Sequence, residues 1–161
     1  MFCDVISADK DKEFIDFSFR LGYSKLFSKT ELNIVYGIND LVNRNAVENP
    51  KVDILLDCHK SNKKIKLNTI DSGFNQVLAK LAFKNKVALG FSFNSLFNSD
   101  DYPKLRQNIK LCRKYKVPIV CLSLANNKYE MRAVNDMMSL LKIIGMTPGE
   151  ARFAFTYLEK R

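Results

Sequence analysis

The stretch from Asp71 to Ser99 constrains the fold more than any other part of this chain. N-cap residue types at Asp71 and Ser72 precede apolar residues at helical spacing, namely Phe74, Val77, Leu78, Leu81 and Ala82. Nearly every residue from Val87 to Phe93 is then apolar, which is the pattern of a strand buried on both faces of a parallel sheet. A helix that ends near Asn85, followed by a buried strand, is the αβ half of an α/β repeat.

Apolar runs predict five further strands, at residues 2–6, 25–29, 33–38, 52–57 and 118–123. Helical spacing predicts helices that begin at Asp9 or Asp11, cover residues 39–47, 104–115 and 134–145, and begin again at Thr147. The start of the last helix is clearly marked, because Thr147, Pro148 and Glu150 match a capping box with proline at N1. The strands at 25–29 and 33–38 leave no room for a crossover helix, so either they are antiparallel or that helix is missing.

Strands that alternate with helices imply a parallel α/β sheet. A closed eight-stranded barrel usually needs about 200 residues or more, and this chain has 161. We therefore expect a single domain, residues 1–161, that is a shortened, incomplete TIM-barrel-like parallel sheet of about six or seven strands ringed by helices, or else an open sheet. The unclosed edge must be covered by a terminal helix or by a partner.

The composition is that of an ordinary globular protein, with 47% hydrophobic and 27% charged residues. No apolar run reaches the roughly 18 residues that span a bilayer, and the first residues lack the pattern of a signal peptide. These features predict a cytoplasmic protein with no membrane segment. The four cysteines, Cys3, Cys58, Cys112 and Cys121, lie far apart. Their spacing does not match zinc sites and predicts reduced, partly buried thiols that behave as small hydrophobic groups.

The net charge of +9 is unevenly distributed along the chain. Residues 1–57 contain seven basic and ten acidic residues, whereas residues 58–161 contain nineteen basic and seven acidic ones. An acidic first third and a strongly basic remainder favour a surface that binds a polyanion such as nucleic acid. The alternative is a solvated, lysine-rich surface with no such partner.

The helix predicted from residue 104 on has six basic residues up to Lys116 and no acidic one. At about 100° per residue, Leu105, Ile109 and Cys112 form a core stripe. A ridge on another side carries Arg106, Lys110, Arg113 and Lys114, whose like charges repel one another unless phosphates neutralise them. The ridge is thus a candidate RNA contact, the alternative being a solvated face. A second candidate is the basic loop with Lys60, Lys63, Lys64 and Lys66.

Phe83 is a candidate anchor for a protein partner. On the helix that ends near Asn85, Phe83 falls with Gln76 and Ala79 on the side opposite the Phe74, Leu78 and Leu81 stripe. Its ring is therefore either covered by a later segment or exposed as an interface anchor.

The residues give little support to metal or nucleophilic catalysis. His59 is the single histidine, so a multi-histidine metal site is excluded, and we expect this side chain at a solvent or RNA edge rather than acting as a catalytic base. Neither a GxxxxGK[ST] nor a GxGxxG motif is present. Asp53 and Asp57 flank a strand, and we expect these carboxylates to be solvated or to have a capping role at the strand ends.

Several stretches together resemble one known family. The run GFNQVLAKLAFKNKVALGFSF, followed by Leu96, resembles the archaeal protein component 3 of ribonuclease P, the counterpart of the eukaryotic 30 kDa subunit. The similarity continues in VDILLD, in RKYKVPIV, in Ser123 to Ala125, in Tyr129 to Arg132 and from Asp136 to Met146. The matches occur in the right order over roughly residues 33 to 155.

The resemblance implies a TIM-barrel-like fold related to the polymerase and histidinol phosphatase superfamily, with the N-terminal third shortened by about one βα unit. It implies a non-catalytic subunit of a ribonucleoprotein that removes the 5′ leader of precursor tRNA. In that endoribonuclease the RNA subunit holds Mg²⁺ and hydrolyses the phosphodiester, so no cofactor is expected on this chain. The implied partners are ribonuclease P RNA, precursor tRNA indirectly, and a ferredoxin-like protein subunit in a heterodimer or heterotetramer.

Some residue roles follow from the resemblance by position. Arg132 matches the family's arginine before the penultimate helix, as a phosphate contact or a structural clamp. Gly90 and Ser92 match a Gly-Phe-Ser strand, and Ser123 matches a serine that ends a strand; all three are expected to be structural. Two alternatives from other classes remain open at this stage: a small metal-independent TIM-like hydrolase that uses the strand ends, and a general RNA chaperone without a fixed partner.

Overall fold

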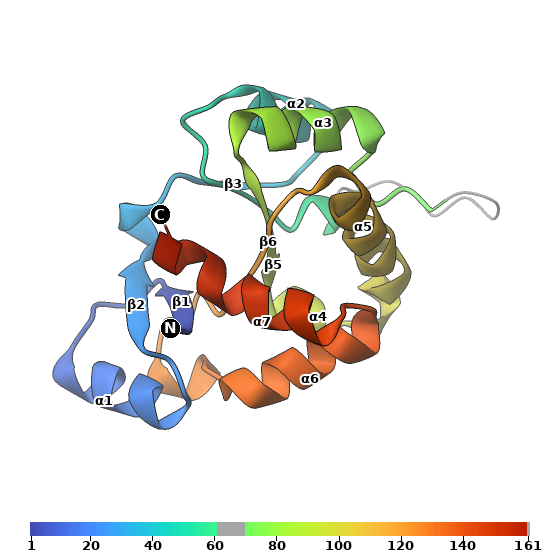
Figure 1. Ribbon diagram of the computed structural model, residues 1–161. Coiled ribbons are helices and arrows are strands. Elements are labelled where there is room, and N and C mark those ends of the chain that lie inside the picture. Colours follow the sequence, from blue (N-terminus) through green and yellow to red (C-terminus); the bar gives the residue numbers. More distant parts are fainter. Residues whose placement is uncertain (61–69, 161) are drawn as a thin grey trace.

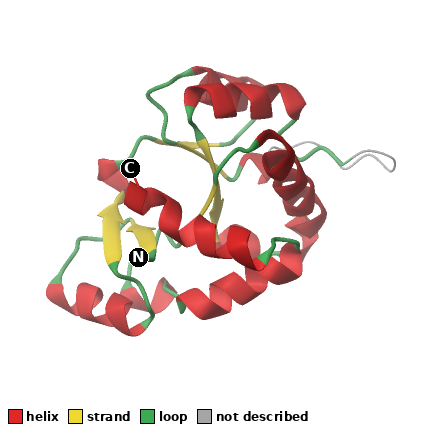
Figure 2. Cartoon of the chain, in the orientation of Figure 1, coloured by secondary structure: helices red, strands yellow, loops and turns green. Residues whose placement is uncertain are grey.

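The structure is a computed structural model that describes residues 1–60 and 70–160. Helices surround the strands (Figure 2). The helices are α1 (Lys12–Arg20), α2 (Asp40–Glu48), α3 (Gln76–Asn85), α4 (Phe93–Leu96), α5 (Tyr102–Tyr115), α6 (Val134–Ile144) and α7 (Pro148–Thr156). Short 3₁₀ turns follow several elements: η1 (Lys29–Glu31), η2 (Cys58–Lys60), η3 (Ser99–Asp101), η4 (Lys128–Glu130) and η5 (Tyr157–Lys160).

The strands are β1 (Cys3–Ile6), β2 (Lys25–Ser28), β3 (Ile34–Tyr36), β4 (Ile54–Leu56), β5 (Ala88–Ser92) and β6 (Ile119–Leu122). They form a two-stranded sheet, β1-β2, and a four-stranded sheet, β3-β4-β5-β6. Every strand pairing among the described residues is parallel, which confirms the predicted parallel α/β class. β2 and β3 belong to different sheets and are connected through η1 without a longer helix, so the antiparallel alternative is wrong.

β1 and the segment that follows β6 join the two sheets. The backbone N–H of Leu124 donates to the Val5 carbonyl over 2.9 Å, and that of Ser7 donates to the Ala125 carbonyl over 2.9 Å. The strands therefore follow one another as β2, β1, β6, β5, β4 and β3 around a barrel-like wall that is open between β2 and β3 (Figure 1). An incomplete barrel of this kind is what the length of the chain predicts.

The inside of this wall holds a small apolar cluster to which alternate residues of the strands contribute. Its buried members are Cys3, Val5, Ile54, Leu56, Ala88, Val120, Leu122 and Leu158. Gly90 leaves room for them, because a Cβ there would lie 2.7 Å from Ile54 Cγ2. Leu158 comes from η5, and Phe27, Leu32 and Ile34, from the two sides of the opening, pack against the same cluster. The turn η5 thus lies inside the opening, which agrees with the alternative of a terminal helix, and a covering partner stays a prediction.

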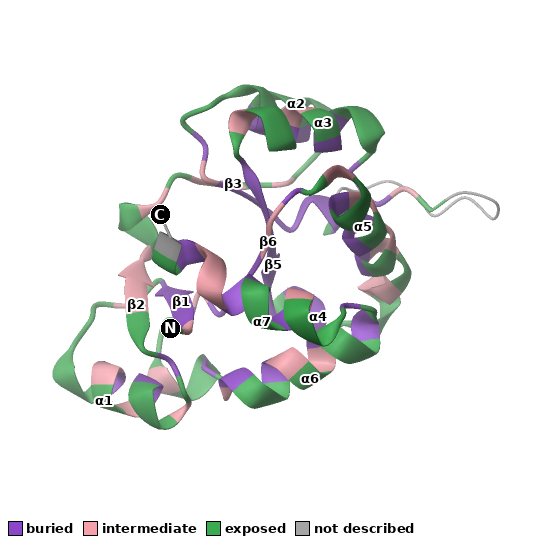
Figure 3. Cartoon of the chain, viewed as in Figure 1, coloured by how far each residue is buried: buried purple, intermediate pink, exposed green. Residues whose placement is uncertain are grey.

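A larger core lies between the strands and the helices, whose buried residues face inward (Figure 3). The predicted stripe of α5, with Leu105, Ile109 and Cys112, is buried there. All four cysteines are free, as predicted, and they are fully rather than partly buried. The capping box of α7 is also confirmed, since the Thr147 hydroxyl accepts from the Glu150 N–H and the Glu150 carboxylate accepts from the Thr147 N–H.

The start of α3 differs from the prediction. The helix begins at Gln76, and the N-cap is Asn75, whose side chain accepts from the N–H groups of Val77 and Leu78. Gly73 prevents an earlier start: its φ is +67°, and a Cβ would lie 1.9 Å from the Cys58 carbonyl oxygen. The buried face consists of Leu78, Ala79 and Ala82, because α3 packs against both α2 and α5. Val77, predicted to face inward, is exposed, and Ala79, predicted to face outward, is buried.

Candidate functional site

The carboxyl ends of all six described strands meet at one cleft of about 490 Å³. One residue at or directly after the end of each strand lines it: Ser7, Lys29, Gly37, Asp57, Ser92 and Ser123, for β1 to β6 in order. We call this pocket the strand-end cleft. Parallel strands bring their carboxyl ends to the same side of a sheet, which is where ligands bind in α/β folds.

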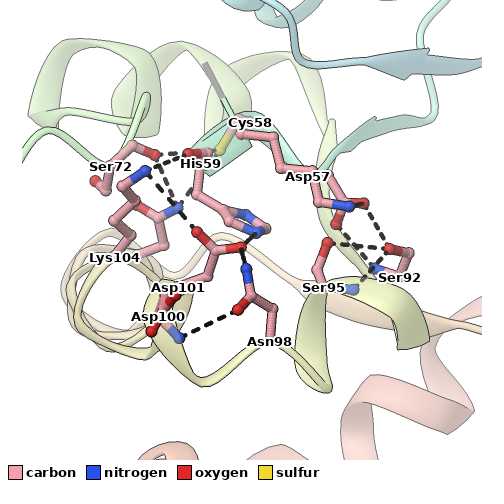
Figure 4. A network of polar contacts seen from close by, with 12 residues as sticks. Asp57, Cys58, His59, Ser72, Ser92, Ser95, Asn98, Asp100, Asp101 and Lys104 are labelled. Atoms are coloured by element: carbon pink, nitrogen blue, oxygen red, sulfur yellow. Dashed lines mark hydrogen bonds and ion pairs between the residues drawn. The ribbon is translucent and has the colours of Figure 1, made fainter. Parts of the chain in front are cut away.

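Asp57 and Ser92 form the centre of the cleft wall (Figure 4). The carboxylate of Asp57 accepts from the Ser92 N–H over 2.9 Å and from the Ser92 hydroxyl over 2.6 Å. Because the single Ser92 proton is used there, the Ser95 hydroxyl, 3.1 Å away, donates to Ser92 Oγ. The expectation that Asp57 is solvated is wrong, since its side chain is buried against the next strand. These hydrogen bonds tie Ser92 to the neighbouring strand, and the structural role that the resemblance implies for it stays a prediction.

Ser123 links β1 to β6 through Asp4. The Ser123 N–H donates to the Asp4 carboxylate over 2.8 Å, and the Ser123 hydroxyl donates to the Val5 carbonyl over 3.3 Å. Asp4 is fully buried, and its Oδ2 has no hydrogen-bond partner among the described residues. Burial raises the pKa of Asp4 to about 7, although backbone N–H groups of Ser123 and Val5 oppose this shift.

Three cations line the strand-end cleft: Lys29, Lys60 and Arg132. Lys60 Nζ lies 3.5 Å from the Asp57 carboxylate. Arg132 Nη1 donates to the carbonyls of Tyr129 and Met131 over 2.7 and 2.8 Å, and its guanidinium carbon lies 5.8 Å from the centre of the Phe97 ring. Lys29 Nζ lies 4.8 Å from the centre of the Tyr36 ring. Two cations are therefore paired with aromatic rings that line the same cleft.

The backbone of the cleft contains two unusual conformations. Asp57 and Leu124 each have φ of 51°, a left-handed region that residues with a Cβ rarely adopt. The other described non-glycine residues with positive φ, Lys86 and Lys116, sit at helix C-termini, where this conformation is ordinary. Strained residues of this kind concentrate at ligand-binding and catalytic sites.

His59 does not lie at a solvent edge, so that prediction is wrong. The turn η2 directs the imidazole into the protein, where it is fully buried and 6.1 Å from the Phe91 ring centre. Its Nδ1 and Nε2 have no hydrogen-bond partner among the described residues, and Nε2 lies 3.9 Å from the Asp101 carboxylate (Figure 4). Burial lowers the pKa of His59 despite the nearby carboxylates of Asp57 and Asp101.

The ridge on α5 contains two arginines that bind backbone carbonyls and two exposed lysines. Arg106 Nε donates to the Ile144 carbonyl over 2.9 Å, and Arg113 Nη2 donates to the Gly145 carbonyl over 3.0 Å. Both arginines thus donate hydrogen bonds to carbonyls at the C-terminal end of α6. A positive charge at this end also interacts favourably with the helix dipole. Lys110 and Lys114 are exposed, which leaves them as the ridge's candidates for RNA contact. Lys63 and Lys64 of the basic loop lie outside the described residues.

Phe83 is 54% exposed and lines an apolar groove of about 440 Å³ between α3, α5 and α7. We call it the Phe83 groove. Its other walls include Ile119 at the start of β6, Phe153 and Tyr157, and its rim includes Lys86 and Lys116. The predicted outward position of Phe83 is thereby confirmed, and the groove lies at the end of the strands opposite to the strand-end cleft.

Sequence reasoning missed several residues of the strand-end cleft, among them Lys29, Tyr36 and Phe97, and it did not assign Asp57 to a site. The available signal was positional: Lys29 and Asp57 directly follow a predicted or observed strand end, where ligand-binding residues of parallel sheets occur. Within residues 1–60 and 70–160, the structure contains no group of three or more His, Cys, Asp or Glu side chains that could hold a metal ion. No helix in the same ranges is long and apolar enough to cross a membrane.

Parallel strands around an apolar centre, helices outside them and a polar cleft at the carboxyl ends define a TIM-barrel-like α/β protein. The family model described as RNase P subunit p30 matches residues 6–160, and the chain belongs to this family.

Similar proteins agree with this assignment. The chain is 36% identical over 143 residues to Ribonuclease P protein component 3 of Methanosarcina mazei, covering 85% of this chain and 56% of that protein. It is 33% identical over 126 residues to the protein of the same name from Methanocaldococcus jannaschii, covering 74% of this chain and 51% of that protein. The chain thus spans about half the length of the curated relatives it matches.

A solved structure is similar over nearly the whole chain. A chain in the cryo-EM structure of archaeal ribonuclease P with mature tRNA superposes with a TM-score of 0.68 and 25% sequence identity. The match covers 99% of this chain and 80% of that one.

Proposed function

We propose that this protein is a subunit of ribonuclease P that supports a catalytic RNA in removing the 5′ leader of precursor tRNA in the cytoplasm. The observation that carries the proposal is the similarity, over 99% of this chain, to a chain of archaeal ribonuclease P with mature tRNA. Family membership over residues 6–160 supports the same role.

The proposed role of the isolated chain is non-catalytic. The carboxylate of Asp57, which a hydrolase would need free at the strand ends, accepts two hydrogen bonds from Ser92 and faces Lys60. The Asp4 carboxylate is buried between strands and does not line the cleft. In this proposal the RNA subunit holds the Mg²⁺ ions, and the protein contributes charge and shape.

The proposed mechanism is electrostatic. Lys110 and Lys114 on α5, with Lys60 and Arg132 at the strand-end cleft, would neutralise backbone phosphates so that RNA segments pack closely at lower Mg²⁺ concentration. Arg106 and Arg113 would act indirectly, because their guanidinium groups hold the end of α6.

The proposed protein partner is a ferredoxin-like subunit that binds at the Phe83 groove. The groove exposes the rings of Phe83 and Phe153 between the basic side chains of Lys86 and Lys116. A partner that presents an apolar side chain flanked by carboxylates complements both features. Because the groove and the strand-end cleft lie at opposite ends of the strands, protein and RNA could bind at the same time.

The proposal is tested by cleavage of precursor tRNA at limiting Mg²⁺, with the RNA subunit and the ferredoxin-like subunit reconstituted with or without this protein. The expected result is a marked decrease in the Mg²⁺ concentration needed. The paired variant Lys110→Glu/Lys114→Glu should weaken RNA binding and reduce the slope of log affinity against log salt by about two.

The matched control is Lys80→Glu/Lys84→Glu, which makes the same charge change at the same spacing on α3. An unchanged Mg²⁺ requirement with the folded wild-type protein would reject the subunit role. Cleavage without any RNA subunit would instead support a hydrolase.

A further inference from the structure

We propose that the strand-end cleft binds one unpaired nucleotide, with its base stacked on Phe97 and its phosphate held by the cations of the cleft. The ligand chemistry is a nucleoside phosphate, either within an RNA strand or free. The RNA source rests on the proposed function.

The size and origin of the cleft suit a specific small ligand. Its volume of about 490 Å³ lies within the range of 300–1,000 Å³ that is typical of ligand pockets. Its walls come from the ends of six strands, so they are held by the sheets rather than by a single loop. The left-handed backbone at Asp57 and Leu124 occurs at two of these strand ends.

The charges of the cleft favour an anion. The Asp57 carboxylate accepts two hydrogen bonds from Ser92 and lies 3.5 Å from Lys60 Nζ. The Glu130 carboxylate accepts from the side chains of Asn126 and Asn127 over 3.3 and 2.7 Å. Three cations, Lys29, Lys60 and Arg132, line the cleft together with these two carboxylates, so the formal charge of its lining is positive. Lys29 has no carboxylate partner among the described residues.

Arg132 is already positioned for a phosphate. Its Nη1 is fixed by the carbonyls of Tyr129 and Met131, and the guanidinium group lies over the Phe97 ring. Its other guanidinium nitrogens make no hydrogen bond within the described residues, so they remain donors for a ligand. Because the side chain is held before binding, little rotamer entropy is lost when a phosphate arrives.

Two exposed aromatic rings supply the surface for a base. Phe97 is 54% exposed and Tyr36 is 40% exposed, and both line the cleft. One face of Phe97 is occupied by the Arg132 guanidinium group, and a base can stack on the other. Cations beside stacking rings are the combination that binds unpaired nucleotides with little sequence preference.

The test measures binding of a fluorescent RNA pentamer of adenylates, of the same pentamer without bases, and of adenosine monophosphate (AMP) as a competitor, to the full chain. The wild-type protein should bind the pentamer with bases about tenfold more tightly than the abasic strand. Phe97→Ala should remove this difference and leave abasic binding unchanged, and Phe97→Tyr should retain it. Phe83→Ala is the matched control, because Phe83 is equally exposed but lines the other groove.

Each arm has a defined meaning. Displacement of the pentamer by AMP in a Phe97-dependent manner identifies a free nucleotide as a ligand, and binding of the strand alone identifies RNA. Equal binding of base-containing and abasic strands, with no effect of Phe97→Ala and no AMP binding, would overturn the inference. If wild-type protein and Phe97→Ala lower the Mg²⁺ requirement equally while nucleotide binding is absent, the inference fails and the subunit role stands.

Discussion

The carboxyl group of Asp4 lies fully buried where β1 meets the segment after β6. One oxygen accepts from two backbone N–H groups, those of Val5 and Ser123, and thereby fixes the register between the two sheets. Because the Asp4 carboxylate is removed from solvent, its charged form is destabilised. Burial therefore raises the pKa of Asp4 to about 7. The Asp4 carboxyl group that aligns the two sheets therefore makes the free energy of unfolding depend on pH.

Asp4→Asn is predicted to remove most of this dependence. The folded pKa of about 7 exceeds the usual value of 3.8, so the contribution of Asp4 to stability is complete below about pH 4 and is lost as pH rises to 7. The loss is on the order of 4 kcal/mol in the free energy of unfolding. The amide keeps an oxygen for both N–H groups and carries no charge.

The measurement is urea denaturation of wild type and Asp4→Asn between pH 4 and pH 8, with Asp16→Asn on α1 as an exposed control. Burial lowers the pKa of His59, so its contribution has the opposite sign and is lost as pH falls below its usual value of 6.5. Because both proteins contain His59, the difference between their curves isolates Asp4. Parallel curves would contradict the prediction.

At the scale of elements, Arg113 of α5 contacts both sides of the junction between α6 and α7. Arg113 donates to both oxygens of Glu150 over 2.6 Å and to the Gly145 carbonyl over 3.0 Å. The Arg113 guanidinium group is the main reason why the pKa of Glu150 is lowered to about 2. Glu150 also completes the capping box of α7 with Thr147. The pair of Arg113 and Glu150 therefore contributes to the end of α6, to the start of α7 and to the packing of α5 against both.

Glu150→Gln is predicted to lower the free energy of unfolding at pH 7 by about 1 kcal/mol, because the pair is half exposed and screened by solvent. The folded pKa is below the usual value of 4.5, so this contribution is present above that value and is lost as pH falls toward 2. A double-mutant cycle with Arg113→Gln measures the coupling at low and high salt. A coupling near zero at low salt would show that the pair does not hold the junction.

At the scale of the whole molecule, the turn η5 packs against the inside of the open barrel. Leu158 of η5 is buried among residues of β1, β4, β5 and β6, and hydrophobic residues near both sides of the opening pack against this cluster. The inner cluster is small, so one side chain fills a large fraction of it.

Leu158→Ala is predicted to lower the free energy of unfolding by about 2–4 kcal/mol, because it leaves a cavity that the surrounding strands cannot fill. Ile143→Ala, at a side chain that is 68% exposed on α6, should change it by less than about 0.5 kcal/mol. Chemical denaturation followed by circular dichroism measures both. Equal effects of the two substitutions would mean that η5 does not cover the barrel opening.

The features predicted correctly from the sequence are those that depend on nearby residues. The capping box from Thr147 to Glu150, the end of α3 at Asn85 and the burial of β5 each follow from residue types within a few positions of one another. The alternation of strands and helices also predicts the parallel class. The length of 161 residues predicts an incomplete barrel or an open sheet, because a closed eight-stranded barrel usually needs about 200 residues.

Only the tertiary structure decided which elements meet. The sequence could not place His59 inside the core, assign Arg106 and Arg113 to the end of α6, or separate β2 from β3, because each depends on residues far away along the chain. The same holds for the strand-end cleft. Its residues carry no local motif, and they form one site because the register of parallel strands brings six chain positions to the same edge.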